Sequence, residues 1–107
     1  MFSIKRGDLL PVLTFVLEDA NGPVDLTNCV VTFIFRMQND LAIAQRRTAG
    51  INITNALGGA GRYSWAPGDT DQVGQYSAEF EVKFPDNRVE TFPNDSDLEF
   101  TIRADVG

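Results

Sequence analysis

The side chains that perform most protein chemistry are scarce in this sequence. It contains no histidine, and Cys29 is the only cysteine. The common zinc sites and the Ser-His-Asp or Cys-His nucleophile systems are therefore excluded, and no disulfide can form within the chain. Cys29 begins the strand-like run Cys-Val-Val-Thr-Phe, so we expect it to be a small buried residue rather than a reactive one.

Carboxylates are the remaining side chains that could catalyse a reaction or bind a metal ion. Paired carboxylates can hydrolyse glycosides, and either Asp69 with Asp71 or Asp95 with Asp97 could supply oxygen ligands to calcium. These aspartates and Asp86 lie in segments rich in Gly, Pro and Asn, where aspartate commonly stabilises turns. Turn formation is the favoured interpretation, and we expect no catalytic residue, metal or cofactor.

Two short motifs have well-known functional meanings that the sequence context does not favour. Residues 6–8 spell Arg-Gly-Asp, which we interpret as a turn or bulge rather than an integrin ligand. The glycine-rich segment 55–61 lacks the Lys-Ser or Lys-Thr of a phosphate-binding loop, and a strand pattern rather than a helix follows it. We expect it to be a flexible connection.

The turns that carry these residues are held in place by the strands that they connect. Residues 74–84 form the longest alternation of apolar and polar side chains, which predicts a strand with one buried and one solvated face. Its apolar side chains are Tyr76, Ala78, Phe80, Val82 and Phe84. Weaker patterns predict strands at residues 2–5, 9–18, 29–37, 41–47, 51–53, 62–66, 89–93 and 98–102. Pro11 places the strand 9–18 at a sheet edge, or at a switch between two sheets.

The run 29–37 has two faces that differ in apolar character. Its odd-numbered members are larger and more aromatic, so we assign them to the core, which leaves Val30 and Ile34 on an outer face that is partly apolar. Cover within the domain is the favoured explanation for this face, and a partner is the alternative. Arg46 and Arg47 form a small basic spot on an acidic chain, where a salt-bridged contact with a neighbouring subunit is one use. We therefore name Val30, Ile34, Arg46 and Arg47 as candidate interface residues.

The spacing of the strands predicts the fold class. About seven or eight short strands separated by turns, with no convincing helix, are typical of an all-β, Ig-like antiparallel β-sandwich formed by residues 1–107 as one domain. The Gly74-x-Tyr76 pattern at a strand start is typical of a tyrosine corner. Tyr63 and Trp65 share one parity, so we expect both to pack between the sheets; an exposed aromatic would instead suit sugar binding.

The overall charge narrows the classes of partner. Of the 107 residues, 15 are acidic and 9 basic, giving a net charge of −6. That balance argues against nucleic acid, which is bound by clustered Lys and Arg, and against an anionic membrane surface. No segment approaches the roughly 20 apolar residues of a membrane helix, and the first residues lack the apolar core of a secretion signal. We expect synthesis in the cytoplasm.

Several segments together resemble the Ig-like domain found at the N-terminus of siphophage baseplate upper proteins and in small phage structural proteins. The resemblance lies, in the family's order, in Lys-Arg-Gly-Asp followed by Leu-Pro-Val-Leu (5–8 and 10–13), Gly-Pro-Val-Asp-Leu-Thr-Asn before Val-Thr-Phe (22–28 and 31–33), Gly-Arg-Tyr-Ser-Trp (61–65), residues 74–82 and Glu-Thr-Phe-Pro (90–93). It implies a virion component that works through protein contacts with other virion proteins, in a symmetric assembly. Without the family's coiled-coil stalk or receptor-binding region, an adaptor, fibre-anchor or decoration module is expected.

Three hypotheses of function remain. The first is a bacteriophage structural protein of the tail, baseplate or capsid surface, located in the virion. The second is a carbohydrate-binding or adhesion module, which requires an exposed aromatic platform such as Trp65. The third, an enzyme, requires convergent carboxylates in a concave pocket. We favour the first and expect no enzymatic activity.

Overall fold

The computed structural model describes residues 2–38, 44–93 and 98–104, and within them every regular element is a β-strand. The prediction of an all-β fold is confirmed. Eleven strands are present in the described residues rather than seven or eight, because several are very short: β1 (Phe2–Lys5), β2 (Leu13–Val16), β3 (Glu18–Asp19), β4 (Gly22–Pro23), β5 (Val30–Met37), β6 (Gln45–Arg47), β7 (Ile51–Asn55), β8 (Ala60–Tyr63), β9 (Gly74–Lys83), β10 (Val89–Phe92) and β11 (Leu98–Arg103).

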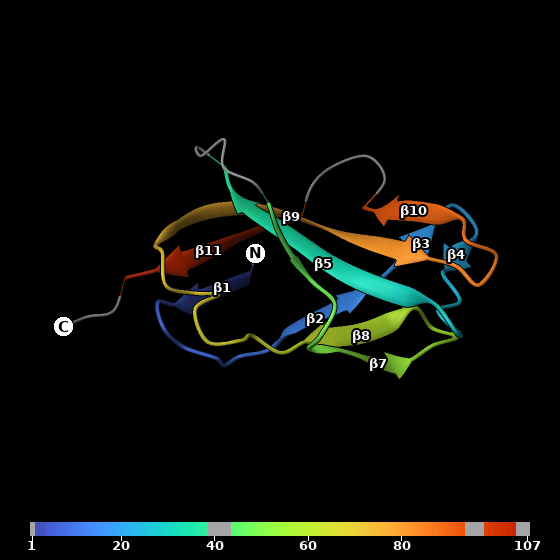
Figure 1. Cartoon of the computed structure of the whole chain (residues 1–107), viewed down its shortest axis with the longest axis horizontal. Helices are drawn as coiled ribbons and strands as arrows, with labels where there is room; N and C mark the ends of the chain where they lie inside the picture. The colour runs from blue at the N-terminus through green and yellow to red at the C-terminus, as the bar shows by residue number, and fades with distance from the viewer. Residues whose placement is uncertain (1, 39–43, 94–97, 105–107) are drawn as a thin grey trace.

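The strands form two packed sheets (Figure 1). The larger sheet has the order β1-β11-β9-β5-β6, and β10 pairs with β9 along the same edge as β11. The smaller sheet has the order β2-β8-β7, and β3 with β4 forms a separate hairpin. Strand neighbours β2-β8-β7 and β5-β9-β11 match the B-E-D and C-F-G orders of the immunoglobulin fold. The Ig-like sandwich predicted from the sequence is therefore the observed architecture, and its strand pairs are antiparallel except that β1 runs parallel to β11.

Aromatic side chains fill the space between the two sheets. Phe15 of β2 packs on Phe80 of β9 with ring centroids 4.3 Å apart, and Tyr63 of β8 packs on Phe33 of β5 at 4.8 Å. These inward positions are those that the alternation in residues 29–37 and 74–84 predicted. The prediction of a buried odd-numbered face on β5 is confirmed, since Val31, Phe33 and Phe35 all belong to the core.

The tyrosine corner is also present. The hydroxyl of Tyr76 donates a hydrogen bond to the carbonyl oxygen of Gln72, four residues upstream, at 2.7 Å. Tyr76 stacks on Phe100 of β11 with ring centroids 5.0 Å apart. The bond fixes the entry of the chain into β9, the strand that pairs with β5, β10 and β11.

Several predicted strands are shorter than their sequence patterns. The pattern in residues 9–18 becomes β2 and, after a break at Leu17, β3; the chain changes sheets between β1 and β2, around Pro11, as predicted. Of the predicted strand 41–47 only β6 is described, and residues 41–43 lie outside the described part of the chain. Strand β8 starts at Ala60 and ends at Tyr63, so the strand predicted at 62–66 is displaced toward the N-terminus.

The glycine-rich segment is more constrained than the flexible connection that we expected. Its backbone is tied to two other segments, because the N–H of Leu17 donates to Gly59 O and the N–H of Leu26 donates to Ala56 O, each at 2.9 Å. Within the turn, the N–H of Gly59 donates to Ala56 O at 3.1 Å. The β7–β8 turn thus joins the loop that precedes β5 to the end of β2.

Candidate functional site

The face of the larger sheet that points away from the smaller one, here called the outer face, carries three of the four candidate interface residues. Val30 is one of them. The strand register places Val30 beside Lys83 and Lys83 beside Val89, in one row across β5, β9 and β10. Val30 is 51% exposed and Val89 is 56% exposed. Two apolar side chains therefore flank a lysine, whose methylene stem can extend the apolar surface between them.

Ile34 lies on the same face but is covered within the domain. It is only 8% exposed, and the register places it between Arg46 of β6 and Glu79 of β9. A shallow hollow of about 240 Å³ lies beside it, lined by Ile34, Phe35, Arg36, Ala44, Ser77, Ala78 and Glu79. Ile34 forms an apolar floor rather than an accessible contact, and cover within the domain was the favoured explanation of this face.

Arg46 lies over this outer face and is occupied by an ion pair. One of its terminal nitrogens is 2.9 Å from a carboxylate oxygen of Glu81, and its side chain remains 55% exposed. An exposed pair of this kind contributes little to stability, of the order of 0–1 kcal/mol. Arg46 is therefore accessible to a partner, although an intramolecular ion pair already holds it.

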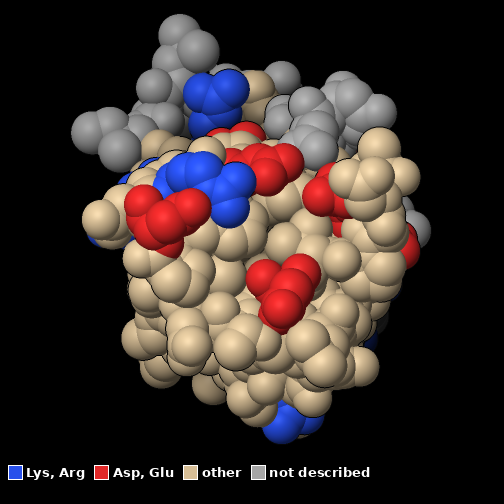
Figure 2. All heavy atoms as spheres, turned by 90° about the vertical axis from the view of Figure 1, so that its right-hand side faces the viewer, with Lys and Arg blue, Asp and Glu red and all other residues tan. Residues whose placement is uncertain are grey.

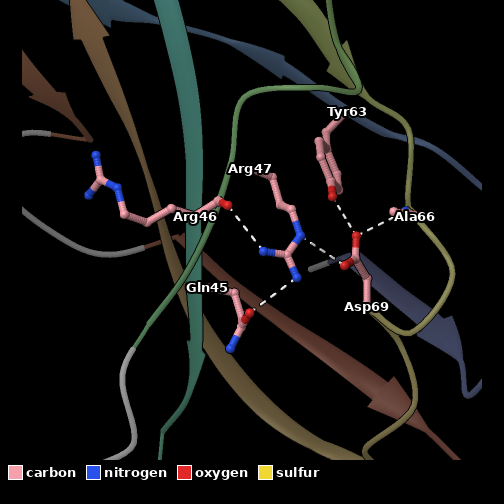
Figure 3. Close-up of polar contacts among 6 residues, drawn as sticks. All are labelled: Gln45, Arg46, Arg47, Tyr63, Ala66 and Asp69. Atoms are coloured by element: carbon pink, nitrogen blue, oxygen red, sulfur yellow. Dashed lines mark hydrogen bonds and ion pairs between the residues drawn. The ribbon is translucent and has the colours of Figure 1, made fainter.

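Arg47 points to the other side of the sheet and has a different environment. It is the register partner of the core residue Phe33, and its guanidinium carbon lies 5.7 Å from the centre of the Phe35 ring. Figure 3 shows the guanidinium between the carbonyl of Arg46, the side chain of Gln45 and the carboxylate of Asp69. These contacts hold Arg47 at the edge of the sandwich, with 32% of its side chain exposed.

Asp69 is the centre of this polar cluster. Its carboxylate accepts hydrogen bonds from the Tyr63 hydroxyl, from the N–H of Ala66 at 2.9 Å and from Nε of Arg47 at 3.1 Å (Figure 3). The side chain of Asp69 is 1% exposed. Burial of a charge is costly unless it is paired and hydrogen-bonded, and here both conditions are met. The cluster is a fully satisfied structural tie between β6, β8 and the loop after β8.

The cluster changes the acidity of its tyrosine. Burial of the ring, followed by the hydrogen bond to Asp69 and the charge of that carboxylate, raises the pKa of Tyr63 well above its ordinary value. The phenol therefore stays protonated and donates, and it is a poor general base at neutral pH. Arg47 opposes this shift only in part.

The sequence patterns indicated separate roles for Arg47 and Asp69 but did not predict that the two side chains form an ion pair. Arg47 was grouped with Arg46 as a basic spot, and Asp69 was assigned to turn formation. The turn role is correct, since Asp69 accepts the hydrogen bond from Ala66. Its pairing with Arg47 across 22 residues depends on how the sheets stack, which no local pattern encodes.

The aromatic residues that could have formed a sugar-binding platform are inside the protein. Tyr63 is fully buried and Trp65 is 4% exposed, as the shared parity predicted. The indole N–H of Trp65 donates to the carbonyl oxygen of Pro11 at 3.0 Å. The face of neither ring is available for stacking on a sugar.

The remaining candidates for chemistry form local structure. Asp86 accepts hydrogen bonds from the backbone and side chain of Arg88, in the predicted turn between β9 and β10. Asp95 and Asp97 lie outside the described residues. Cys29 is half-buried rather than buried; burial raises the pKa of its thiol, as do the nearby carboxylates of Asp25 and Asp86. In the described residues no group of three His, Cys, Asp or Glu side chains could hold a metal ion.

Charges of both signs are mixed at the end of the sandwich that is on the right in Figure 1. Figure 2 looks onto this end and shows basic and acidic side chains next to one another in its upper part, and mostly uncharged residues below. Mixed signs do not provide the continuous positive surface that binds phosphates. Among the described residues no helix is long and apolar enough to cross a membrane.

Comparison with known proteins adds no relative. A scan against models of protein families finds no family that matches this chain, and a search of curated proteins finds no match.

Proposed function

We propose that the chain is a bacteriophage structural protein that acts through protein–protein contacts in the virion. Its place would be the tail, the baseplate or the capsid surface, as an adaptor, fibre anchor or decoration module. The sequence resemblance to small phage structural proteins and to the N-terminal domain of baseplate upper proteins supports this proposal, as does an Ig-like scaffold whose polar clusters serve structure.

The observation that carries the proposal is the row formed by Val30, Lys83 and Val89 on the outer face. Two half-exposed valines, Val30 of β5 and Val89 of β10, lie on either side of Lys83 of β9 and form a small apolar surface. Protein interfaces combine a small apolar centre with a polar rim. Here the polar rim is supplied by Glu81, Arg46 and Thr91 in the adjacent positions.

Purified particles of the phage that encodes the chain provide the test. Mass spectrometry should detect the protein at a fixed copy number, and cryo-EM should place it in a symmetric position. Absence from every particle would show that the proposal is wrong.

A double variant and a matched control test whether the outer face makes the contact in the particle. Replacing Val30 and Val89 together by Glu should lower incorporation into particles at least about tenfold, because two buried charges would enter an apolar contact. The matched control is Val73→Glu, since Val73 is 44% exposed and precedes β9 outside this face. Equal loss in the control and in the double variant would assign the contact to another surface.

A further inference from the structure

The smaller sheet ends in a strand whose outer edge has no neighbour in the described part of the chain. Among the strands of the described residues, β2 pairs with β8 alone. Its sequence, Leu-Thr-Phe-Val, contains no charged residue, and Thr14 and Val16 are both exposed, Val16 at 59%. An unpaired edge strand can accept a strand from another chain unless charges, bulges or covering segments prevent it.

The hydrogen-bond pattern shows which backbone groups of β2 face outward. The N–H of Leu17 donates to Gly59 O at 2.9 Å, in the register that pairs Phe15 with Gly61 and Leu13 with Tyr63. Because bonding alternates along an antiparallel ladder, the odd-numbered residues of β2 face β8. Thr14 and Val16 therefore direct their N–H and C=O groups toward the free edge.

Other outer edges in the described residues carry features that discourage strand addition: the short strand β10 contains the charged Glu90, and β6, β7 and β1 differ from β2 in their backbone contacts. At β6 the guanidinium of Arg47 bonds to the outward carbonyl of Arg46 at 3.1 Å. At β7 the register shifts between Ile53 and Asn55, which marks a bulge. At β1 the carbonyl of Lys5 already accepts the N–H of Asp8 at 3.0 Å. Charged side chains and bulges are among the devices that protect natural edges, and β2 has neither within Leu13–Val16.

We infer that β2 pairs with β2 of a second copy of the chain, antiparallel and across a two-fold axis at Phe15. This register places Thr14 opposite Val16 of the second copy and Val16 opposite Thr14 of the second copy, so that each pair exchanges both N–H···O bonds. It joins the two smaller sheets into one continuous sheet. The inference rests on the proposed function, because both assign to this chain a role in protein–protein contacts.

Charge and polarity favour a second copy as the occupant of this edge. No like charges meet in the paired strands, and in this register Glu18 lies opposite Val12 of the second copy rather than opposite another acid. On the outer surface of the joined sheet, the exposed side chain of Val16 lies beside Thr14 of the second copy, which presents a methyl and a hydroxyl group. A strand of four residues buries a small area, so we expect dimers only above about 100 µM, or where a particle holds the copies close together.

Sedimentation velocity of the purified protein from about 10 µM to about 1 mM tests the inference. The wild-type chain should shift from monomer to dimer, and Val16→Lys should weaken the association at least about tenfold because it places a charge on each strand beside the two-fold axis. Thr14→Pro should weaken it as well, since it removes an outward N–H but no bond to β8. Amide hydrogen exchange of Thr14 and Val16 should slow as the concentration rises.

The control is Asn52→Lys, which adds the same charge to an exposed position on β7, the opposite edge of the same sheet. It should leave the association unchanged. A wild-type chain that is monomeric at about 1 mM, or an equal effect of Asn52→Lys and Val16→Lys, would overturn the inference. If Thr14→Pro fails to fold by circular dichroism, Val16→Lys decides the result. A monomeric chain that is nevertheless present in particles would leave the proposed function standing and overturn only the pairing of β2 with β2.

Discussion

Two adjacent arginines show how strongly one position in a strand determines a residue's role. Arg46 and Arg47 differ by one place in β6, so their side chains leave opposite faces of the sheet. Arg46 forms an exposed pair with Glu81, whereas Arg47 reaches the buried carboxylate of Asp69. Their common charge therefore does not give them a common function, and the basic spot predicted from the sequence is two separate sites.

This difference predicts unequal effects of the same substitution. Arg47→Ala should lower the free energy of unfolding by about 2–4 kcal/mol, because it leaves the buried Asp69 carboxylate without its cation. Arg46→Ala should lower it by less than about 1 kcal/mol, as is usual for an exposed pair. Denaturation with urea measures both. A similar loss for the two variants would mean that the Arg47–Asp69 pair contributes no more than a surface contact.

The polar cluster also shows where prediction from the sequence stops. Alternation identified the core faces of β5 and β9 because that signal is local and repeats every second residue. The partner of Asp69 is chosen by the stacking of β6 against the loop after β8, over a separation of 22 residues. Likewise, the cover over Ile34 could not be assigned, since parity gives the direction of a side chain and not what lies above it.

At the scale of elements, the turn between β7 and β8 determines how the smaller sheet meets the rest of the chain. Gly59 has a φ of +68°, and a Cβ atom there would lie 2.5 Å from Leu17 O and 2.9 Å from Val24 O. Both neighbours are backbone atoms, which cannot move aside without shifting their strands. The glycine is required by this close approach and by its positive φ.

Comparing Gly59 with Gly68 separates the cost of the close approach from the cost of the positive φ. Gly68 has a φ of +95°, and a Cβ atom there would have no neighbour within 4 Å. Gly68→Ala should therefore cost about 1–2 kcal/mol for the conformation alone, whereas Gly59→Ala should cost at least about 2 kcal/mol more because of the added clash. Thermal or chemical unfolding provides the comparison. Equal losses would indicate that the β7–β8 turn can move away from β2.

At the scale of the whole molecule, changes in ionisation lower the stability at both low and high pH. The pKa of Asp25 is lowered by hydrogen bonds from Thr27, and that of Asp86 by hydrogen bonds from Arg88. Groups with a lowered pKa stabilise the fold above their ordinary value of 3.8, and this stabilisation is lost as the pH falls. Tyr63 has the opposite behaviour, because its pKa is raised above its ordinary value of 10.0. We therefore expect the protein to be most stable between these two limits.

Cys29 and Tyr63 both have a raised pKa and both contribute to the alkaline limit, and the contribution of Tyr63 can be measured separately. Well below pH 10 the Tyr63 phenol is protonated in both the folded and the unfolded chain, so its shift has no effect on the slope. Above pH 10 the unfolded chain loses this proton while the folded chain retains it, and stability should fall by about 1.4 kcal/mol per pH unit from this group. Tyr63→Phe cannot lose the proton, so its free energy of unfolding should fall less steeply between about pH 10 and 11.5, although it starts lower because Asp69 loses a donor. Chemical denaturation of both proteins across this range measures the two slopes. Parallel slopes would mean that water reaches the phenol and that the cluster with Asp69 and Arg47 opens before the sandwich unfolds, whereas diverging slopes would show that the edge of the sandwich stays closed until the two sheets separate.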